Sequence, residues 1–299
     1  MSDINKEYPE LLQRISSLKE KINKLEEIVG RQYPKYDGEK IVVYSANRIE
    51  YKDIERSLKT LITNSPVDKV YIFAEDDEVP FQLPSFAEVV NYSNQKIFPS
   101  YIPWKEVGAS ISGLIKLALH SLLSQHKRVL YLKPATLILG DLSELFTLPM
   151  GDWYLFGAVE ENRHYVEAND VRKPSNKLSL YKAPSLKKEP YYNCEVLLMN
   201  LEELRNSGVG NALIERANNY YTFRPDSTAI NILSKDRVFP VSSVYNWSYN
   251  TCEDHYPKIV QLLDPEDHSE LAGVIKLYDM IPLSEIVTWR EGDRDDANS

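Results

Sequence analysis

Cysteine is scarce in this chain of 299 residues, which contains only Cys194 and Cys252. Two cysteines cannot build the multi-bridge framework that stabilises small secreted domains, so we expect a reducing compartment. The chain also lacks an apolar run near 20 residues and a basic-then-apolar amino terminus. These absences predict neither a transmembrane helix nor a secretory signal and favour a cytoplasmic protein.

Several motifs that carry chemistry are missing as well. There is no glycine-rich phosphate loop and no G-x-S-x-G nucleophile elbow. Cys252 and His255 lie one helical turn apart, but two candidate ligands without a second pair make a poor metal site. A formal net charge of -9 argues against the basic face of a nucleic-acid binder, so no nucleic-acid partner is expected.

The chain is long enough to bury a full core, since 43% of its residues are hydrophobic and 26% are charged. Its length is at the upper limit for one domain, which predicts a single large domain with appendages. The sequence predicts four parts: a helix at residues 1–32, a linker at 33–39, a domain at 40–289 and a charged, disordered tail at 290–299.

Residues 4–29 carry apolar side chains at alternating steps of four and three: Leu11, Ile15, Leu18, Ile22, Leu25 and Val29. The β-branched residues occupy the a positions of this heptad pattern and the leucines the d positions. That distribution favours two parallel strands of coiled coil, so the segment predicts a parallel homodimer. The alternative is an amphipathic helix that packs on its own domain.

From Lys40 onward, short β-rich runs alternate with helical patterns, which is typical of an α/β domain with a mainly parallel sheet. Strands are expected at 41–44, 69–73, 88–92, 129–132, 137–139, 153–159 and 196–200, and helices at 54–63, 111–124 and 201–206. Residues 160–190 are polar and contain prolines. A loop of this length is usually functional, and we expect it to close over a bound complex.

The segment Tyr131-Leu-Lys-Pro-Ala-Thr-Leu137 combines a buried strand, a polar break and a second apolar run. It resembles the donor-site segment of glycosyltransferase family eight, the glycogenin-like and bacterial galactosyltransferase-like enzymes, which reads Y-L-D-x-D-T-L. Two metal-binding aspartates of that motif are replaced here by Lys133 and Ala135. The apolar runs of the motif are kept, whereas its two metal-binding residues are lost.

Four further segments carry the same resemblance in the same order. They are Ile41 to Asn47, a strand that ends in a small polar turn; Gly113-Leu-Ile-Lys-Leu117, against A-R-L-K-L; Tyr191 to Leu201, against Y-F-N-A-G-V-L-L-I-N-L; and Pro225 to Asn231 with Tyr245-Asn-Trp247, against D-Q-D-x-L-N and a later aromatic-asparagine-aromatic run. The resemblance covers about residues 41–283 and leaves the heptad segment outside.

The resemblance implies a GT-A fold, which is Rossmann-like with a mainly parallel sheet flanked by helices. It also implies a nucleoside-diphosphate sugar such as a uridine diphosphate sugar as donor, a hydroxyl on a glycan, lipid-linked sugar or protein as acceptor, and retention of configuration. Ligands of such sheets bind beyond the carboxyl ends of the strands, which places Asn47, Lys133 and the loop after Met199 around one cleft.

Site residues follow from the matched positions. Nucleotide contacts are expected from Tyr44, Ser45, Ala46, Asn47 and Lys116, with Tyr44 stacked on the base. Asn193 and Asp226 would hold the donor sugar and the acceptor, and Ser227 replaces the family's glutamine. Glu195 replaces a glycine close to the sugar and predicts a changed sugar contact. A structural role is open for Asp226, because it begins a helical run and suits a helix N-cap.

The third metal ligand of the family is a histidine near the end of the domain, where this chain has Lys276. A charged ammonium group has no lone pair for a metal and alanine offers none, so no divalent metal cofactor is expected. Two converging lysines, Lys133 and Lys276, would instead neutralise the diphosphate, whose negative charge grows as its bond to the sugar breaks. Each lysine has the alternative of being a solvated surface side chain.

Two other functions remain open. A catalytically silent relative would bind a glycan or a partner protein and act as a scaffold through its coiled coil. The loss of both aspartates and the histidine agrees with a relative that has lost its catalytic activity. A nucleotidyltransferase on the same sheet is disfavoured, because its chemistry ordinarily needs a metal on the phosphates.

Overall fold

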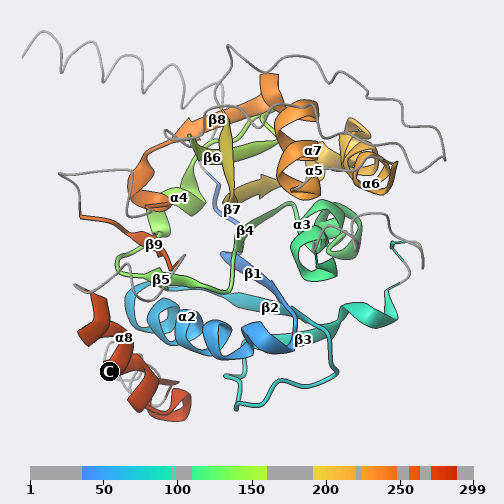
Figure 1. The fold of residues 1–299 in the computed structure, drawn as a ribbon. Coiled ribbons are helices and arrows are strands. Elements are labelled where there is room, and N and C mark those ends of the chain that lie inside the picture. The colour runs from blue at the N-terminus through green and yellow to red at the C-terminus, as the bar shows by residue number, and fades with distance from the viewer. Residues whose placement is uncertain are drawn as a thin grey trace, which may run out of the picture.

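The computed structural model describes residues 36–95, 97–98, 110–159, 191–219, 224–247, 256–262 and 271–287. Its main feature is a seven-stranded sheet with the order β3-β2-β1-β4-β7-β6-β8, beside a two-stranded sheet of β5 and β9 (Figure 1). Only β7 runs against the other strands of the large sheet. The mainly parallel α/β architecture predicted from the sequence is confirmed.

The strands are β1 (Ile41–Ala46), β2 (Lys69–Ala74), β3 (Ala87–Asn91), β4 (Arg128–Leu132), β5 (Thr136–Ile138), β6 (Leu155–Val159), β7 (Tyr192–Asn200), β8 (Val238–Val241) and β9 (Ile259–Gln261). The α-helices are α2 (Tyr51–Asn64), α3 (Ile111–Leu122), α4 (Ser143–Thr147), α5 (Leu201–Asn206), α6 (Val209–Asn219), α7 (Pro225–Leu233) and α8 (Ala272–Met280).

Along the central strands, successive side chains point to opposite faces of the sheet, so a hydrophobic core forms on each face. Side chains such as Val43 and Tyr131 pack with α3 and α7, whereas Val42 and Leu130 pack with α2. Figure 1 shows α3, α5, α6 and α7 together on one side and α2 and α8 on the other. Because both faces are covered, all six residues of β1 are buried, as expected for a central parallel strand.

The direction of β7 corrects one expectation. Val196 pairs with Leu132 at the carboxyl end of β4, and Asn200 pairs with Arg128 at its beginning. The first residues of β7 therefore lie at the ligand-binding edge, while Met199 and the loop after it lie at the opposite edge. β7 also begins at Tyr192, four residues before the strand predicted at 196–200.

Some predictions fall outside the described residues. They concern the helix at 1–32, the first three residues of the linker at 33–39, the loop at 160–190, Cys252 with His255, and the tail at 290–299. Within the described parts of the chain, no helix is long and apolar enough to cross a membrane.

Candidate active site

The candidate site lies along the edge where β1, β2 and β4 end and β7 begins. The backbone N–H of Lys133 donates to the carbonyl of Glu195 over 2.9 Å, which joins the segment after β4 to the start of β7. Asn193 and Glu195 alternate with buried neighbours, so their side chains share one face of β7. The sequence-predicted residues Lys133, Asn193 and Glu195 are thus close to one another.

Lys116 connects this edge to α7 through the protein interior. Its side chain is 1% exposed, and Nζ lies 2.6 Å from Asp226 Oδ2. Nζ also donates to the carbonyl of Cys194 over 2.9 Å and stands 4.8 Å from the ring centre of Tyr131. A buried ammonium group needs such partners, because it has lost its hydration.

The charges of this pair are stabilised by each other. Burial disfavours the charged form of Lys116, but Asp226 together with Tyr131, Glu195 and Cys194 outweighs that effect, and the pKa of the ammonium is raised well above its usual value. Burial likewise opposes ionisation of Asp226, yet the nearby Lys116 lowers the pKa of this carboxyl below its usual value. Both groups are therefore ionised at neutral pH.

Glu195 extends the pair into a chain of alternating charges. One carboxylate oxygen is 3.9 Å from Lys116 Nζ and the other is 3.7 Å from Lys133 Nζ. The Lys133 side chain is 32% exposed and that of Glu195 is 18% exposed. Lys133 is therefore the end of the chain Asp226–Lys116–Glu195–Lys133 that faces solvent.

Glu50, which the sequence analysis did not identify, adds a further carboxylate. It accepts hydrogen bonds from the backbone N–H of Asn47 over 2.9 Å and from Ser112 Oγ over 3.2 Å. Burial raises the pKa of Glu50, and the positive charge of Lys133 opposes that rise. The available signal was the capping-box spacing of Asn47 and Glu50, which fixes the turn after β1.

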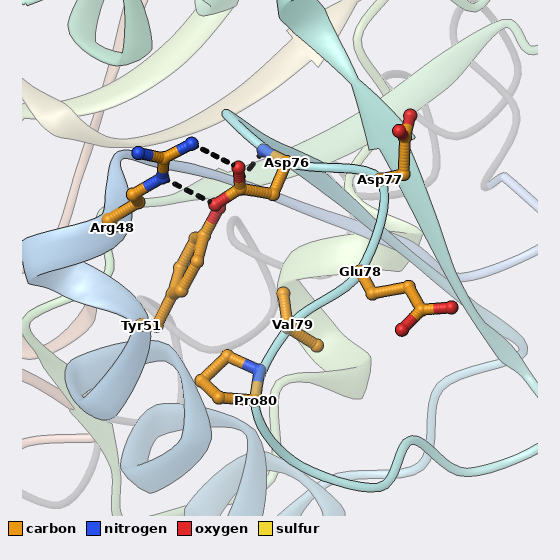
Figure 2. Close-up of a pocket in the computed structure, with 7 residues that line it drawn as sticks. All are labelled: Arg48, Tyr51, Asp76, Asp77, Glu78, Val79 and Pro80. Carbon is orange, nitrogen blue, oxygen red and sulfur yellow. Dashed lines mark hydrogen bonds and ion pairs between the residues drawn. The ribbon is translucent and has the colours of Figure 1, made fainter.

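A pocket of about 710 Å³ opens beyond the ends of β1 and β2. It is lined by Arg48, Tyr51 and residues 76–80 (Figure 2). Arg48 donates to both carboxylate oxygens of Asp76 over 2.8 and 2.6 Å, and Tyr51 Oη donates to Asp76 over 3.1 Å. Figure 2 shows the side chains of Asp77 and Glu78 pointing away from that pair.

The nucleotide contacts expected from the end of β1 need correction. Tyr44 is 0% exposed, and its hydroxyl is 3.0 Å from Ser57 Oγ inside the core, so its ring cannot stack on a base. Ser45 and Ala46 are buried too, and Ser45 Oγ donates to the Ser112 carbonyl. The cause is the central position of β1, which is covered on both faces. Only Asn47 is partly exposed, and its side chain caps the following turn.

Two expectations on α7 also change. Ser227 is 2% exposed, so its side chain does not face a substrate. The N-cap of α7 is Arg224, and Asp226 lies within the first turn after Pro225. The carboxylate of Asp226 points to Lys116 instead of serving as the cap. Likewise, Lys116 is a buried partner of Asp226 and not an exposed nucleotide contact.

Lys276 is not part of the chain of ion pairs Asp226–Lys116–Glu195–Lys133. It is exposed on α8, which packs on α2, where Arg56 donates to both carboxylate oxygens of Asp279 over 2.7 and 3.0 Å. Among the residues that the structure describes, Lys276 makes no ion pair or hydrogen bond. Its convergence with Lys133 on a diphosphate stays a prediction. The residue that β9 brings beside the 133–136 segment is Gln261, which pairs with Thr136.

The described residues do not fit the metal of family eight. Lys133 and Ala135 supply no ligand, and no group of three or more histidine, cysteine, aspartate or glutamate side chains in the described ranges is placed to hold an ion. The 133–136 segment carries the ammonium of Lys133, which faces the carboxylate of Glu195, and Thr136 pairs with Gln261 of β9.

In a comparison with protein families, residues 4–264 match the model described as Glycosyl transferase family 8. The matched range begins in the heptad segment, which was expected to lie outside the family domain. Comparison with curated protein sequences gives no match.

Similar solved structures share the fold at low sequence identity. The bifunctional glycosyltransferase WbbM has 14% identity and a TM-score of 0.62 over 85% of this chain, and GlyE of Streptococcus pneumoniae TIGR4 has 16% and 0.58 over 86%. This chain covers 52% of the first structure and 64% of the second. The galactosyltransferase LgtC, solved with donor and acceptor sugar analogues, has 15% identity and a TM-score of 0.53, with 83% of this chain and 95% of LgtC covered.

Proposed function

Because the chain belongs to glycosyl transferase family 8, we propose that it transfers a sugar from a nucleoside-diphosphate sugar to a hydroxyl group without a divalent metal. The family supports sugar transfer in general. The donor, the acceptor and the metal-free mechanism are the proposal, as are the cytoplasmic location and the parallel homodimer through residues 4–29. The observation that carries it is the position of Lys133 at the carboxyl edge of the sheet, where the family motif has an aspartate.

Lys133 is proposed to replace the cation at the diphosphate. Breaking the bond between sugar and phosphate leaves additional negative charge on the leaving group, and a nearby ammonium lowers the energy of that state. Lys133 is partly exposed and only 3.7 Å from Glu195, so a diphosphate must compete with that carboxylate. Its binding would turn the ammonium from Glu195 towards the phosphate oxygens.

Asp226 is proposed to act as a fixed negative charge. Lys116 lowers the pKa of this carboxyl, and a weakly basic carboxylate is a poor proton acceptor at neutral pH. It suits a hydrogen bond from a sugar hydroxyl or the stabilisation of positive charge on the sugar ring. Lys116 is then a positioning residue, because it contacts Asp226 from within the core.

The nucleoside is proposed to occupy the pocket beyond β1 and β2. Arg48, Tyr51 and Asp76 hold its wall in place through their mutual hydrogen bonds. This pocket and Lys133 lie along one edge of the sheet, since β1 is the neighbour of both β2 and β4. Of the expected nucleotide contacts at the end of β1, Asn47 is kept, and Arg48 takes the place of Tyr44, Ser45 and Ala46.

Calorimetric titration of uridine diphosphate in excess chelator tests the proposal. The Lys133→Gln variant should weaken binding by about fivefold or more, since it removes one phosphate-binding charge. Lys69→Gln is the matched control, because Lys69 begins β2 at the opposite edge and pairs with Glu88. Equal affinities of the two variants and the wild type would contradict a role for Lys133.

A catalytically silent, glycan-binding relative is the second candidate, and the charge balance of the site favours it. Among the residues that the structure describes, Glu50, Glu195 and Asp226 are three carboxylates near two ammonium groups, those of Lys116 and Lys133. Such a balance suits an uncharged ligand better than a diphosphate. This candidate predicts no useful affinity for any of a panel of nucleoside diphosphates, together with measurable binding of a glycan.

A further inference from the structure

Glu50 follows β1 and lies between two parts of the proposed donor site. Its neighbours in the chain, Arg48 and Tyr51, line the pocket beyond β1 and β2 (Figure 2). From the side of β4, the positive charge of Lys133 acts on the Glu50 carboxylate. Because β1 is the strand between β2 and β4, Glu50 stands between the pocket and Lys133.

The two carboxylate oxygens of Glu50 have different surroundings. Oε2 accepts from the backbone N–H of Asn47 over 2.9 Å and from Ser112 Oγ over 3.2 Å. Within the described ranges, Oε1 makes no hydrogen bond or ion pair and is not among the polar atoms that are both unpartnered and shut off from solvent. The residue is partly exposed. One oxygen is therefore held in place, and the other is open to a ligand.

Hydroxyl groups at the start of α3 fix the direction of these hydrogen bonds. The backbone N–H of Gly113 donates to Ser110 Oγ over 3.2 Å, and Ser110 Oγ lies 2.7 Å from Ser112 Oγ. A hydroxyl has one hydrogen, and that of Ser112 goes to Glu50, so Ser110 must donate to Ser112. The whole chain donates towards Glu50, whose ionised carboxylate only accepts. A ligand atom that meets Oε1 must therefore be a donor.

Capping of the turn after β1 explains only half of this arrangement. Glu50 completes a capping box with Asn47, and the bond from the Asn47 N–H to Oε2 is part of that box. A capping box accepts glutamine as well as glutamate at this position, since one side-chain oxygen is sufficient. The cap thus requires neither the charge of Glu50 nor its second oxygen.

We propose that Oε1 of Glu50 accepts hydrogen bonds from the 2′ and 3′ hydroxyls of the donor's ribose and makes the site selective for ribonucleotides. The inference rests on the proposed function, which places the base in the pocket and the diphosphate at Lys133. Ribose is the part of a nucleotide that joins base and diphosphate. It must therefore pass the residue that stands between the two places.

Ribose suits this carboxylate better than the other parts of the nucleotide. Its two neighbouring hydroxyls are donors, and a carboxylate that binds ribose hydroxyls is the arrangement found in dinucleotide-binding domains. Hydrogen bonds to an ionised group are stronger than those between neutral groups. A phosphate beside Glu50 would be repelled, whereas the uncharged ribose is not. A negative charge can thus lie close to a diphosphate site and still favour binding.

The test compares ribose, 2′-deoxy and 2′,3′-dideoxy forms of uridine, guanosine and adenosine diphosphate by calorimetry in excess chelator. The wild type should bind the ribose form about tenfold or more tighter than the dideoxy form of the same base. Glu50→Gln keeps the cap, because its amide oxygen takes the place of Oε2 and its nitrogen faces the ribose. This variant should lower the preference to less than about threefold.

Two further variants make the comparison decisive. Glu55→Gln is the matched control on α2, where Glu55 pairs with Lys59 over 2.7 Å, and it should keep the wild-type preference. Ser112→Ala leaves Glu50 in the chain but removes one donor that holds Oε2. It should reduce the preference about two- to threefold, and it serves as the test if Glu50→Gln does not fold.

The outcomes separate this inference from the proposed function. If the diphosphates bind and only the Glu50 and Ser112 variants lose the preference for ribose, both stand. If the diphosphates bind but the wild type has no such preference, or folded variants keep it, the ribose assignment is overturned and the proposed function is not. If uridine binds tighter than 2′,3′-dideoxyuridine through Glu50 but the diphosphate adds no affinity, the assignment stands and the proposed function fails. Absence of binding by every probe overturns both.

Discussion

At the residue scale, the most constrained group in the site is Lys116. Its ammonium is shut off from water, and a distance of 2.6 Å to Asp226 makes the two charges dependent on each other. Removing one partner of such a pair leaves an uncompensated buried charge, which is more harmful than never having had the pair. Lys116 is therefore expected to contribute to stability as well as to the position of Asp226.

Replacement of Lys116 by methionine should lower the free energy of unfolding by about 3–5 kcal/mol at pH 7.5. The loss should shrink near pH 4.5, because Asp226 without Lys116 has a raised pKa and becomes protonated there. In the wild type the pKa of Asp226 is lowered, so its stabilising contribution persists until the pH falls below the usual aspartate range. Urea unfolding at both pH values measures the difference, and a loss that is equal or larger at pH 4.5 would contradict the assignment.

Glu195 should restrain Lys133 in the unliganded protein. The Glu195→Gln change removes the competing charge 3.7 Å from the ammonium and should tighten uridine diphosphate binding about two- to fivefold, as suits a partly exposed ion pair. Calorimetry in chelator gives the affinity, and the double variant Lys133→Gln/Glu195→Gln should show no such gain. Weaker binding by Glu195→Gln would instead identify Glu195 as a direct ligand contact.

The sequence identified Lys133, Asn193, Glu195 and Asp226, and the structure brings them to one region. The sequence could not show which positions at the end of β1 are exposed and which are buried. A short polar run after a strand has the same sequence pattern whether its residues face solvent or the core. Tyr44 was misjudged for that reason. Gln261 was not identified, because the end of the domain was matched to the family through a short apolar run, without the pairing of β9 that places this residue beside the lost motif. The convergence of Lys276 with Lys133 stays a prediction.

At the scale of elements, the long periodic segments were predictable and the short ones were not. The helices now seen as α2 and α3 and the strands β1, β2 and β4 follow from hydrophobic periodicity. β9 has only three residues and β8 only four, and strands this short carry little pattern. The antiparallel direction of β7 arises from tertiary pairing, and the sequence of an isolated buried strand does not encode it.

The docking of α8 gives a prediction for an element. Asp279 accepts two hydrogen bonds from Arg56 of α2, and the Arg56 side chain is only 11% exposed. Asp279→Asn should lower the free energy of unfolding by about 1 kcal/mol and speed amide hydrogen exchange in residues 272–280. Glu88→Gln, at an exposed pair with Lys69, is the control. Unchanged exchange in α8 would show that apolar packing alone holds this helix.

At the scale of the whole molecule, the chain keeps the sheet of a family 8 glycosyltransferase and changes the charges at its edge. The pocket beyond β1 and β2 and the chain of ion pairs follow one another along the ends of β2, β1, β4 and the start of β7. Membership of this family was predictable from the sequence, because five segments resemble the family and occur in the same order. The acidic balance of the site was not, because it depends on Glu50 and Glu195 meeting Lys133 in space.

Sugar transfer in the absence of metal is the most direct measurement. Purified protein is incubated with a panel of nucleoside-diphosphate sugars in excess chelator, and release of the nucleoside diphosphate is followed with and without added manganese. We expect release that persists in chelator, does not require manganese and falls at least about tenfold in the Lys133→Gln variant. Release that chelator abolishes and manganese restores would contradict the account.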